Sequence, residues 1–204
     1  MREKLESLGF TVTMIPDSGR EQMVRSLAAF SKTASRADLA LFFYAGHGVQ
    51  IAGINYLVPI DTNLNDRSQA RLHMVSINDT VDQLPGKIKP VFLDACRNDP
   101  LPLLTSSGSR GVTRGLAPIS VSEGTLVSYA TKDGQEADDG DGRPNSPYTA
   151  ALLKHLSDFD DIAVVLRKVR EKMVAATGGK QQPWEYGSLT GGALILSAIR
   201  RQVL

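Results

Sequence analysis

The chain has 204 residues, 42% of them hydrophobic, which is enough for one domain with a substantial core. Its 23 basic and 22 acidic side chains leave a net charge of +1, so charge gives no indication of a nucleic-acid or membrane partner. No apolar run approaches the roughly 20 residues of a membrane span, and the first residues lack the apolar stretch of a signal peptide. The single cysteine, Cys96, excludes an internal disulfide framework; a free thiol suits a reducing compartment, and we expect a cytoplasmic protein.

Strand and helix patterns alternate along the chain. In chain order we expect a helix closing at Gly9, a strand over 10–15, a helix over 20–32, a buried strand over 38–44, a hairpin around Ala52-Gly53, a helix from the Ser76 cap to about Leu84, strands over 89–96 and 125–131, helices over 147–156 and 161–176, and a last strand over 193–197. Strands separated by helices predict a three-layer α/β fold, with a mostly parallel sheet covered on both faces. No repeat or linker divides the chain, which indicates one domain over 1–204.

Two buried strands each end in a residue that suits nucleophilic chemistry. His47 follows the first strand between two glycines, and Cys96 ends the strand over 89–96. In open α/β sheets the functional site lies at the carboxyl ends of the strands, where long loops over 97–120 and 132–146 also begin. These features predict a site at that edge.

A thiolate beside an imidazole is a strong nucleophile, and His47 can return a proton to a leaving amine. The glycines leave room for a peptide, and the backbone N–H groups of Gly48 and Cys96 can form an oxyanion hole. The alternative is that Cys96 is a small buried hydrophobic residue, as lone cysteines at strand ends often are. The placement of both residues on one sheet edge favours the catalytic pair. His73 and His155 have no partner motif and are interpreted as surface or helix residues.

The motifs YAGHG (44–48) and DACRN (94–98) resemble caspase-like cysteine peptidases (clan CD, peptidase C14 type), specifically bacterial metacaspase- or paracaspase-type members, the orthocaspases. The histidine lies 49 positions before the cysteine, close to the caspase spacing. The resemblance extends through NYLVPID, SYAT, NSPYTAALL and PWEYGSLTG, so it covers nearly the whole chain. It implies a caspase-like fold, a large-subunit-like part over about 1–110, a small-subunit-like part over about 120–204, and a catalytic dyad of His47 and Cys96.

The residues around the nucleophile predict specificity for basic side chains. Strand alternation directs Asp94 to the same side as Cys96, and the resemblance places such an aspartate at the base of the pocket for the residue before the cut. Alignment on YAT adds Asp139, and the resemblance also assigns Tyr129 and Ala130 to substrate binding. Two carboxylates favour arginine over lysine. For the acidic loop at 138–141, a solvated turn remains an equal alternative.

The sequence also departs from its relatives. They carry a strand before the first helix, which would lie centrally between 10–15 and 38–44, and its absence predicts unpaired backbone edges. Arg110 and Arg114 lie in the loop where relatives are cut, so self-cleavage and a flexible basic loop are both open readings. We expect no cofactor; the DDGDG acids give only weak support for calcium, because they lack the EF-hand spacing. The alternative to an endopeptidase is a weak or inactive caspase-like scaffold that binds peptides; a dimer is possible.

Overall fold

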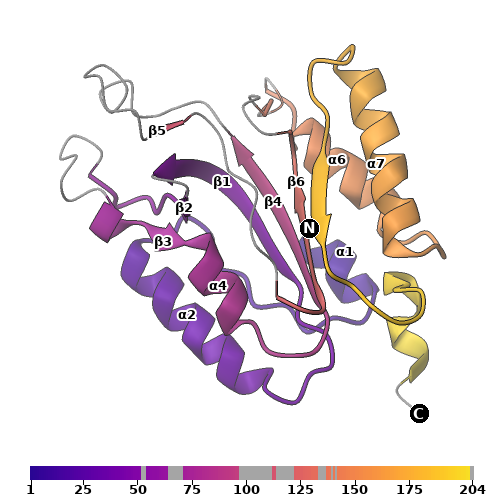
Figure 1. Cartoon of the computed structure of the whole chain (residues 1–204), viewed down its shortest axis with the longest axis horizontal. Helices are drawn as coiled ribbons and strands as arrows, with labels where there is room; N and C mark the ends of the chain where they lie inside the picture. Colours follow the sequence, from indigo (N-terminus) through magenta and orange to yellow (C-terminus); the bar gives the residue numbers. More distant parts are fainter. Residues whose placement is uncertain are drawn as a thin grey trace.

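The computed structural model describes residues 1–51, 54–63, 71–96, 112–113, 122–132, 137–138, 140 and 142–202, with Cys96 described through its backbone only. These residues contribute seven strands to one sheet, in the order β3-β2-β1-β4-β6-β7, with β5 also paired to β1 (Figure 1). The strands are β1 (Phe42–Ile51), β2 (Ile54–Leu57), β3 (Val75–Ser76), β4 (Lys89–Cys96), β5 (Val112–Thr113), β6 (Thr125–Tyr129) and β7 (Trp184–Gly187). The central strands β1, β4 and β6 are parallel, and the strands at the margins pair antiparallel.

Helices cover both faces of the sheet, which confirms the expected α/β class (Figure 1). One face carries α2 (Arg20–Thr33) and α4 (Ile77–Gln83), and the other carries α1 (Arg2–Ser7), α6 (Pro147–His155) and α7 (Ile162–Ala176). Two 3₁₀ segments, η1 (Arg71–His73) and η2 (Leu196–Gln202), complete the described elements. The helices over 147–156 and 161–176 are therefore confirmed to within a residue.

Three helices begin where their capping residues place them. The side-chain oxygens of Ser76, Ser146 and Asp161 each accept a hydrogen bond from a backbone N–H in the first turn of α4, α6 and α7. This satisfies a donor that the helix itself leaves unpaired. Pro147 follows Ser146 at the first helical position, where its missing N–H costs nothing. The cap of α6 matters below, because the same serine also contacts the predicted site.

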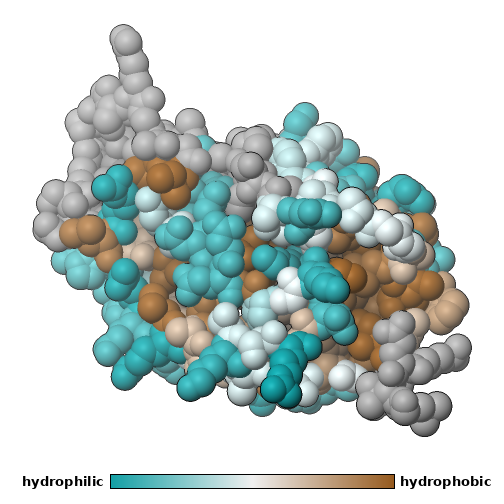
Figure 2. All heavy atoms as spheres, turned by 60° about the horizontal axis from the view of Figure 1, so that its bottom comes forward, coloured by the Kyte–Doolittle hydropathy of each residue, from teal (hydrophilic) through white to brown (hydrophobic). Residues whose placement is uncertain are grey.

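The core forms above and below the sheet. Strand alternation sends Phe92 and Ala130 towards α6 and α7, where they join fully buried residues of these helices such as Leu152 and Met173. Residues of opposite parity, including Leu93 and Tyr129, pack with α4 on the other face. Apolar side chains still reach the surface in separate areas rather than in one continuous band (Figure 2). None of the described helices is long and apolar enough to cross a membrane.

Two strand predictions at the margins are wrong. Residues 10–15 form no strand, although the sequence FTVTMI favours one, because no described strand offers them a ladder. The last strand expected over 193–197 is also absent, since β7 already occupies the outer edge of β6. Leu194 instead binds the start of α7: its N–H donates to Asp161 Oδ2 and its carbonyl accepts from Ile162, both at 2.8 Å.

The strand expected over 38–44 is shifted rather than lost. It starts at Phe42 and continues through the Gly46-His47-Gly48 segment to Ile51, while Leu39 makes only an isolated parallel bridge to Ile88. From Gly48 onwards β1 pairs with β2, which confirms the expected hairpin. Before Gly48, none of the described strands pairs with the edge of β1 that faces away from β4.

Candidate active site

His47 and Cys96 lie side by side in the sheet. They are direct register partners in the parallel pairing of β1 with β4. Neighbouring strands are about 4.8 Å apart, and register partners project their side chains to the same face, so the two residues can act on one substrate. His47 is exposed. The strand positions therefore support the pair that the sequence predicts.

The backbone at His47 is held by two donors. Its carbonyl oxygen accepts a hydrogen bond from the Val58 N–H at 3.0 Å and another from the Tyr44 hydroxyl at 2.8 Å. The Tyr44 side chain passes over Gly46, where a Cβ atom would lie 2.7 Å from the phenol oxygen. Gly46 thus has a reason that sequence analysis missed, because it makes room for Tyr44 as well as for a substrate.

Asp94 is buried beneath this edge, with 5% of its surface exposed. Its Oδ2 atom accepts hydrogen bonds from the hydroxyls of Ser146 and Thr149, each at 2.5 Å. Both donors belong to the start of α6, and Ser146 Oγ also caps the helix by accepting from the Thr149 N–H at 3.0 Å. Asp94 lies on the same side of β4 as Cys96, as strand alternation predicts, and it is tied to α6.

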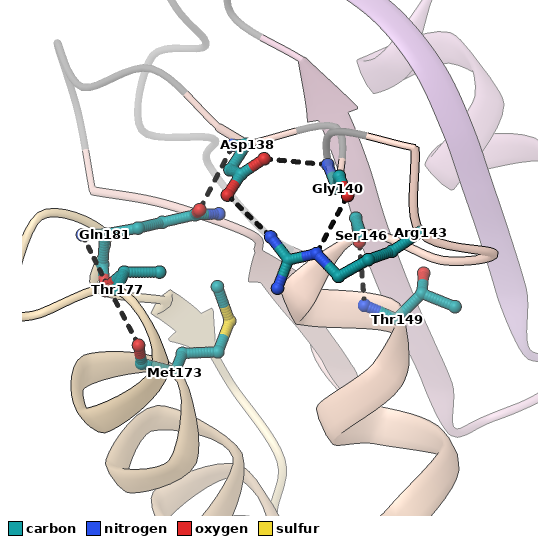
Figure 3. A network of polar contacts seen from close by, with 8 residues as sticks. All are labelled: Asp138, Gly140, Arg143, Ser146, Thr149, Met173, Thr177 and Gln181. Carbon is teal, nitrogen blue, oxygen red and sulfur yellow. Dashed lines mark hydrogen bonds and ion pairs between the residues drawn. The ribbon is translucent and has the colours of Figure 1, made fainter.

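The segment that follows β6 is fixed by a polar network (Figure 3). The buried Gln181 donates from Nε2 to the Ala130 carbonyl at 2.9 Å and accepts from the Asp138 N–H at 3.1 Å. Asp138 also pairs with Arg143 at 3.2 Å and accepts from the Gly140 N–H at 2.7 Å. Asp138 is therefore neither a free pocket acid nor a simple solvated residue: it organises the loop around a guanidinium of the same chain.

Two further predicted substrate contacts lie in the core. The side chains of Tyr129 and Ala130 are 2% and 1% exposed, and Tyr129 makes an edge-to-face contact with Tyr186. Ala130 donates its N–H to the Leu93 carbonyl at 2.9 Å, which continues the pairing of β6 with β4. These side chains support the site from below, and direct substrate contact by either residue stays a prediction.

Several predictions lie outside the described residues: the pocket role of Asp139, the fate of Asp141, and cleavage at Arg110 or Arg114. The described residues contain no group of three or more histidine, cysteine, aspartate or glutamate side chains that could hold a metal ion. Calcium activation therefore stays untested.

Comparison with known proteins now decides the family. A family model described as the caspase domain, Peptidase_C14, matches residues 1–193. The chain belongs to the caspase-domain family. The recognition that rested on YAGHG and DACRN is thereby confirmed, and the strand positions of His47 and Cys96 are those of a domain from a cysteine-peptidase family.

Two curated relatives are similar to this caspase-family domain over most of its length. Human mucosa-associated lymphoid tissue lymphoma translocation protein 1 is 26% identical over 186 residues, which cover 87% of this chain and 21% of that protein. The homolog from Mus musculus is 26% identical over 176 residues, 83% of this chain and 20% of that protein. The chain thus spans about a fifth of the length of the curated relatives it matches.

Solved structures show the same fold. Caspase-1 from Spodoptera frugiperda superposes with a TM-score of 0.65 at 23% identity, covering 96% of this chain and 77% of that one. The structure of pro-sf-caspase-1 gives a TM-score of 0.62 at 21% identity, over 93% and 79% of the two chains. The caspase-like α/β fold is confirmed, whereas the finer assignment to bacterial metacaspases or orthocaspases stays a prediction.

Sequence analysis missed four residues that shape the site: Tyr44, Ser146, Thr149 and Gln181. The Ser146-Pro147 pair does announce a helix start. Its contact with Asp94, 52 residues earlier, has no local signal, because it depends on how α6 packs against β4. Tyr44 lies inside the YAGHG motif, but the sequence does not reveal that its hydroxyl returns to the backbone three residues later.

Proposed function

We propose that this caspase-family domain is a cysteine endopeptidase that cleaves peptide bonds after basic residues, with arginine preferred over lysine. The observation that carries the proposal is the register pairing of His47 with Cys96 on two adjacent parallel strands. The family membership supports the reaction class. Protein or peptide substrates with a basic residue before the cut are the expected partners.

The reaction needs only this chain and water. The Cys96 thiolate adds to the carbonyl carbon, and the C=O π electrons move to the oxygen, which the N–H groups of Gly48 and Cys96 stabilise. The C–N bond then breaks as the His47 imidazolium gives its proton to the leaving amine, and a thioester remains on Cys96. His47 next takes a proton from water, hydroxide adds to the thioester, and the C–S bond breaks to release the acid and restore the thiolate.

Specificity for arginine rests on Asp94. Its position two residues before Cys96 directs it to the same face, and its burial strengthens attraction to a cation. The contacts of Oδ2 with Ser146 and Thr149 fix the orientation of the carboxylate without neutralising it, because hydroxyls are neutral donors. A guanidinium can pair with two acceptors at once, which lysine cannot do.

The second candidate function is a weak or inactive scaffold that binds peptides. The observation in its favour is the edge of β1 before Gly48 that no described strand pairs with, because His47 lies on that strand. A poorly held histidine would lower activity while leaving a peptide-binding surface.

Peptide cleavage tests the proposal directly. Fluorogenic peptides ending in Arg, Lys or Asp are incubated with the wild type, Cys96→Ala and His47→Ala. We expect cleavage after Arg and then Lys, reduced to near background in both variants, with unchanged far-UV circular dichroism. His73→Ala, at an exposed histidine away from the site, is the matched control and keeps full activity. Substantial cleavage by Cys96→Ala would remove the dyad, and peptide binding without cleavage by the wild type would favour the scaffold.

Self-cleavage has its own measurement. Mass spectrometry of the purified wild type is expected to find a cut after Arg110, Arg114 or another basic residue of the loop. The cut is expected to disappear in Cys96→Ala. A fully active, uncut enzyme would show that maturation is not required, and the dyad would stand.

A further inference from the structure

The peptide group between His47 and Gly48 is fixed from one side. Its carbonyl oxygen, on His47, accepts from the Val58 N–H at 3.0 Å and from the Tyr44 hydroxyl at 2.8 Å. The Tyr44 oxygen also lies 3.5 Å from the Val58 carbonyl, so the phenol sits between the two segments. A peptide unit is planar and trans, and its N–H points opposite to its C=O. Two donors on the carbonyl of His47 therefore determine the direction of the Gly48 N–H.

That direction is towards β4. The carbonyl of His47 faces Val58, on the side of β1 away from β4, so the Gly48 N–H faces the strand that carries Cys96. Hydrogen bonds accepted by a carbonyl also polarise its peptide group and strengthen the N–H at the other end. Both effects favour a donor aimed at the oxygen of a carbonyl under attack by Cys96.

The phenol is built to stay in this role. Burial raises the pKa of Tyr44 to about 12, so the hydroxyl keeps its proton throughout the range in which a peptidase is assayed. Gly46 is required for the contact, since a Cβ there would lie 2.7 Å from the hydroxyl oxygen and 2.9 Å from the ring carbon that bears it. Before Gly48 no described strand braces this edge of β1, so little else fixes the backbone there.

We propose that Tyr44 is a positioning residue of the oxyanion hole: its hydroxyl holds the His47–Gly48 peptide so that the Gly48 N–H faces the reacting carbonyl. Tyr44 touches no substrate. The inference rests on the proposed peptidase function and adds a residue to its machinery. It also explains the spacing within YAGHG, because the tyrosine, the glycine that admits it and the histidine it holds form one unit.

Tyr44→Phe tests the idea, because it keeps the ring and removes only the hydroxyl. Removing an oxyanion donor outright lowers kcat by about 100- to 1000-fold, so loosening one is expected to lower kcat by about tenfold. KM is expected to be nearly unchanged, and the loss equal for Arg and Lys peptides, because ground-state binding is untouched. Tyr56→Phe, which removes a hydroxyl from a buried ring in the neighbouring strand β2, is the matched control and keeps full activity.

A pair of inhibitors separates positioning from general loosening. A peptide aldehyde adds to the Cys96 thiol to give a hemithioacetal: the S–C bond forms and the carbonyl oxygen takes up the thiol proton or remains as the oxyanion. The matching peptide amide binds without reacting. In Tyr44→Phe we expect the aldehyde to bind about tenfold more weakly while the amide binds as before. A purely structural role would weaken both inhibitors together or lower only the melting temperature.

The outcomes are distinct. If the wild type cleaves peptides and Tyr44→Phe matches it in kcat and in aldehyde affinity, the positioning role is overturned and the peptidase stands. If the wild type neither cleaves nor reacts with the aldehyde, the proposed function fails, and the role of Tyr44 fails with it.

Discussion

Two helices of nearly equal length are packed very differently. The 15-residue α7 buries five apolar side chains against the sheet, whereas the 14-residue α2 buries none and leaves its apolar face half-exposed. The strands beneath α7 are also fully buried, as in β6, while β1 is only partly covered. An amphipathic pattern thus predicts that a helix forms, but its burial depends on the strands that it meets. The chain combines one firmly packed half with one looser margin.

The candidate site straddles this boundary. Asp94 and Cys96 lie on β4, next to α6 and the firm half, and His47 lies on β1 at the looser margin. Placement of the nucleophile and its neighbouring acid therefore follows from core packing. Placement of the histidine depends on a few local hydrogen bonds, those of Tyr44 and Val58.

The largest expected effect concerns matched leucines in the two helices. Leu166→Ala, at a position of α7 that is 2% exposed, is expected to lower the free energy of unfolding by about 2–5 kcal/mol. Leu27→Ala, on the half-buried face of α2, is expected to cost only about 1 kcal/mol, because less apolar area is lost. Urea unfolding measures both. Equal losses would mean that α2 is covered in solution by something outside the described residues, and the comparison would fail.

The next effect lies on the firm side of the site. Asp94→Asn keeps the shape and removes the charge, so the specificity constant for Arg peptides is expected to fall about ten- to a hundredfold, equivalent to roughly 1.5–3 kcal/mol. The loss for matched Gln peptides is expected to be small.

Ser146→Ala is the companion variant for this measurement. It removes the cap of α6 and one contact of Asp94, so it is expected to lower stability by about 1 kcal/mol and to weaken Arg peptides more than Gln peptides. If Asp94→Asn weakens all peptides alike and lowers stability as Ser146→Ala does, Asp94 only anchors α6 and does not read the substrate.

How much the sequence predicted follows the same boundary. The strand over 89–96 and the helix starts at Ser76 and Ser146 were predicted correctly, because caps and buried runs are local signals. The strand over 10–15 was wrong, since a strand needs a neighbour that no local pattern guarantees. Residues 193–197 failed for the related reason that β7 had taken the edge of β6.

The site shows the same division. His47 and Cys96 could be found because motif and strand end coincide at both. The hydroxyls around Asp94 could not, because residues 146 and 149 reach it only through the packing of α6 against β4.

A smaller effect is expected at the clamp behind β6. Gln181→Leu keeps most of the volume but removes the bonds to the Ala130 carbonyl and the Asp138 N–H, two groups that then lose their partner. Leaving such groups unpaired costs about 1–3 kcal/mol. Gln182→Leu, at the half-buried neighbour, is the matched control and is expected to change little. If thermal unfolding finds both variants alike, the clamp does not stabilise the firm half.

The smallest effect separates two surface ion pairs by pH. Lys168, on α7, contacts Asp158 at 2.7 Å and Asp160 at 2.6 Å, and hydrogen bonding to Lys168 and then to His155 lowers the pKa of Asp158. A lowered carboxyl pKa adds stability above the unfolded value of about 3.9, and this stability is lost as the pH falls through the folded value. The pKa of Lys168 is raised by the same contacts, so its contribution is present below about 10.4 and is lost as the pH rises through its folded value.

Lys168→Met is therefore expected to melt slightly below the wild type at pH 7 and to approach it at pH 3, where Asp158 is protonated in both proteins. The matched variant on the looser margin is Arg25→Met, which removes an ion pair with Glu21 on α2. Both of those side chains are more than 70% exposed, so solvent screens the pair and the melting temperature is expected to match the wild type at both pH values. Melting curves of the three proteins at pH 3 and pH 7 decide the matter. A pH-dependent loss in Arg25→Met as large as in Lys168→Met would show that the charges of α2 are held as firmly as those of α7, against the difference in packing between the two helices.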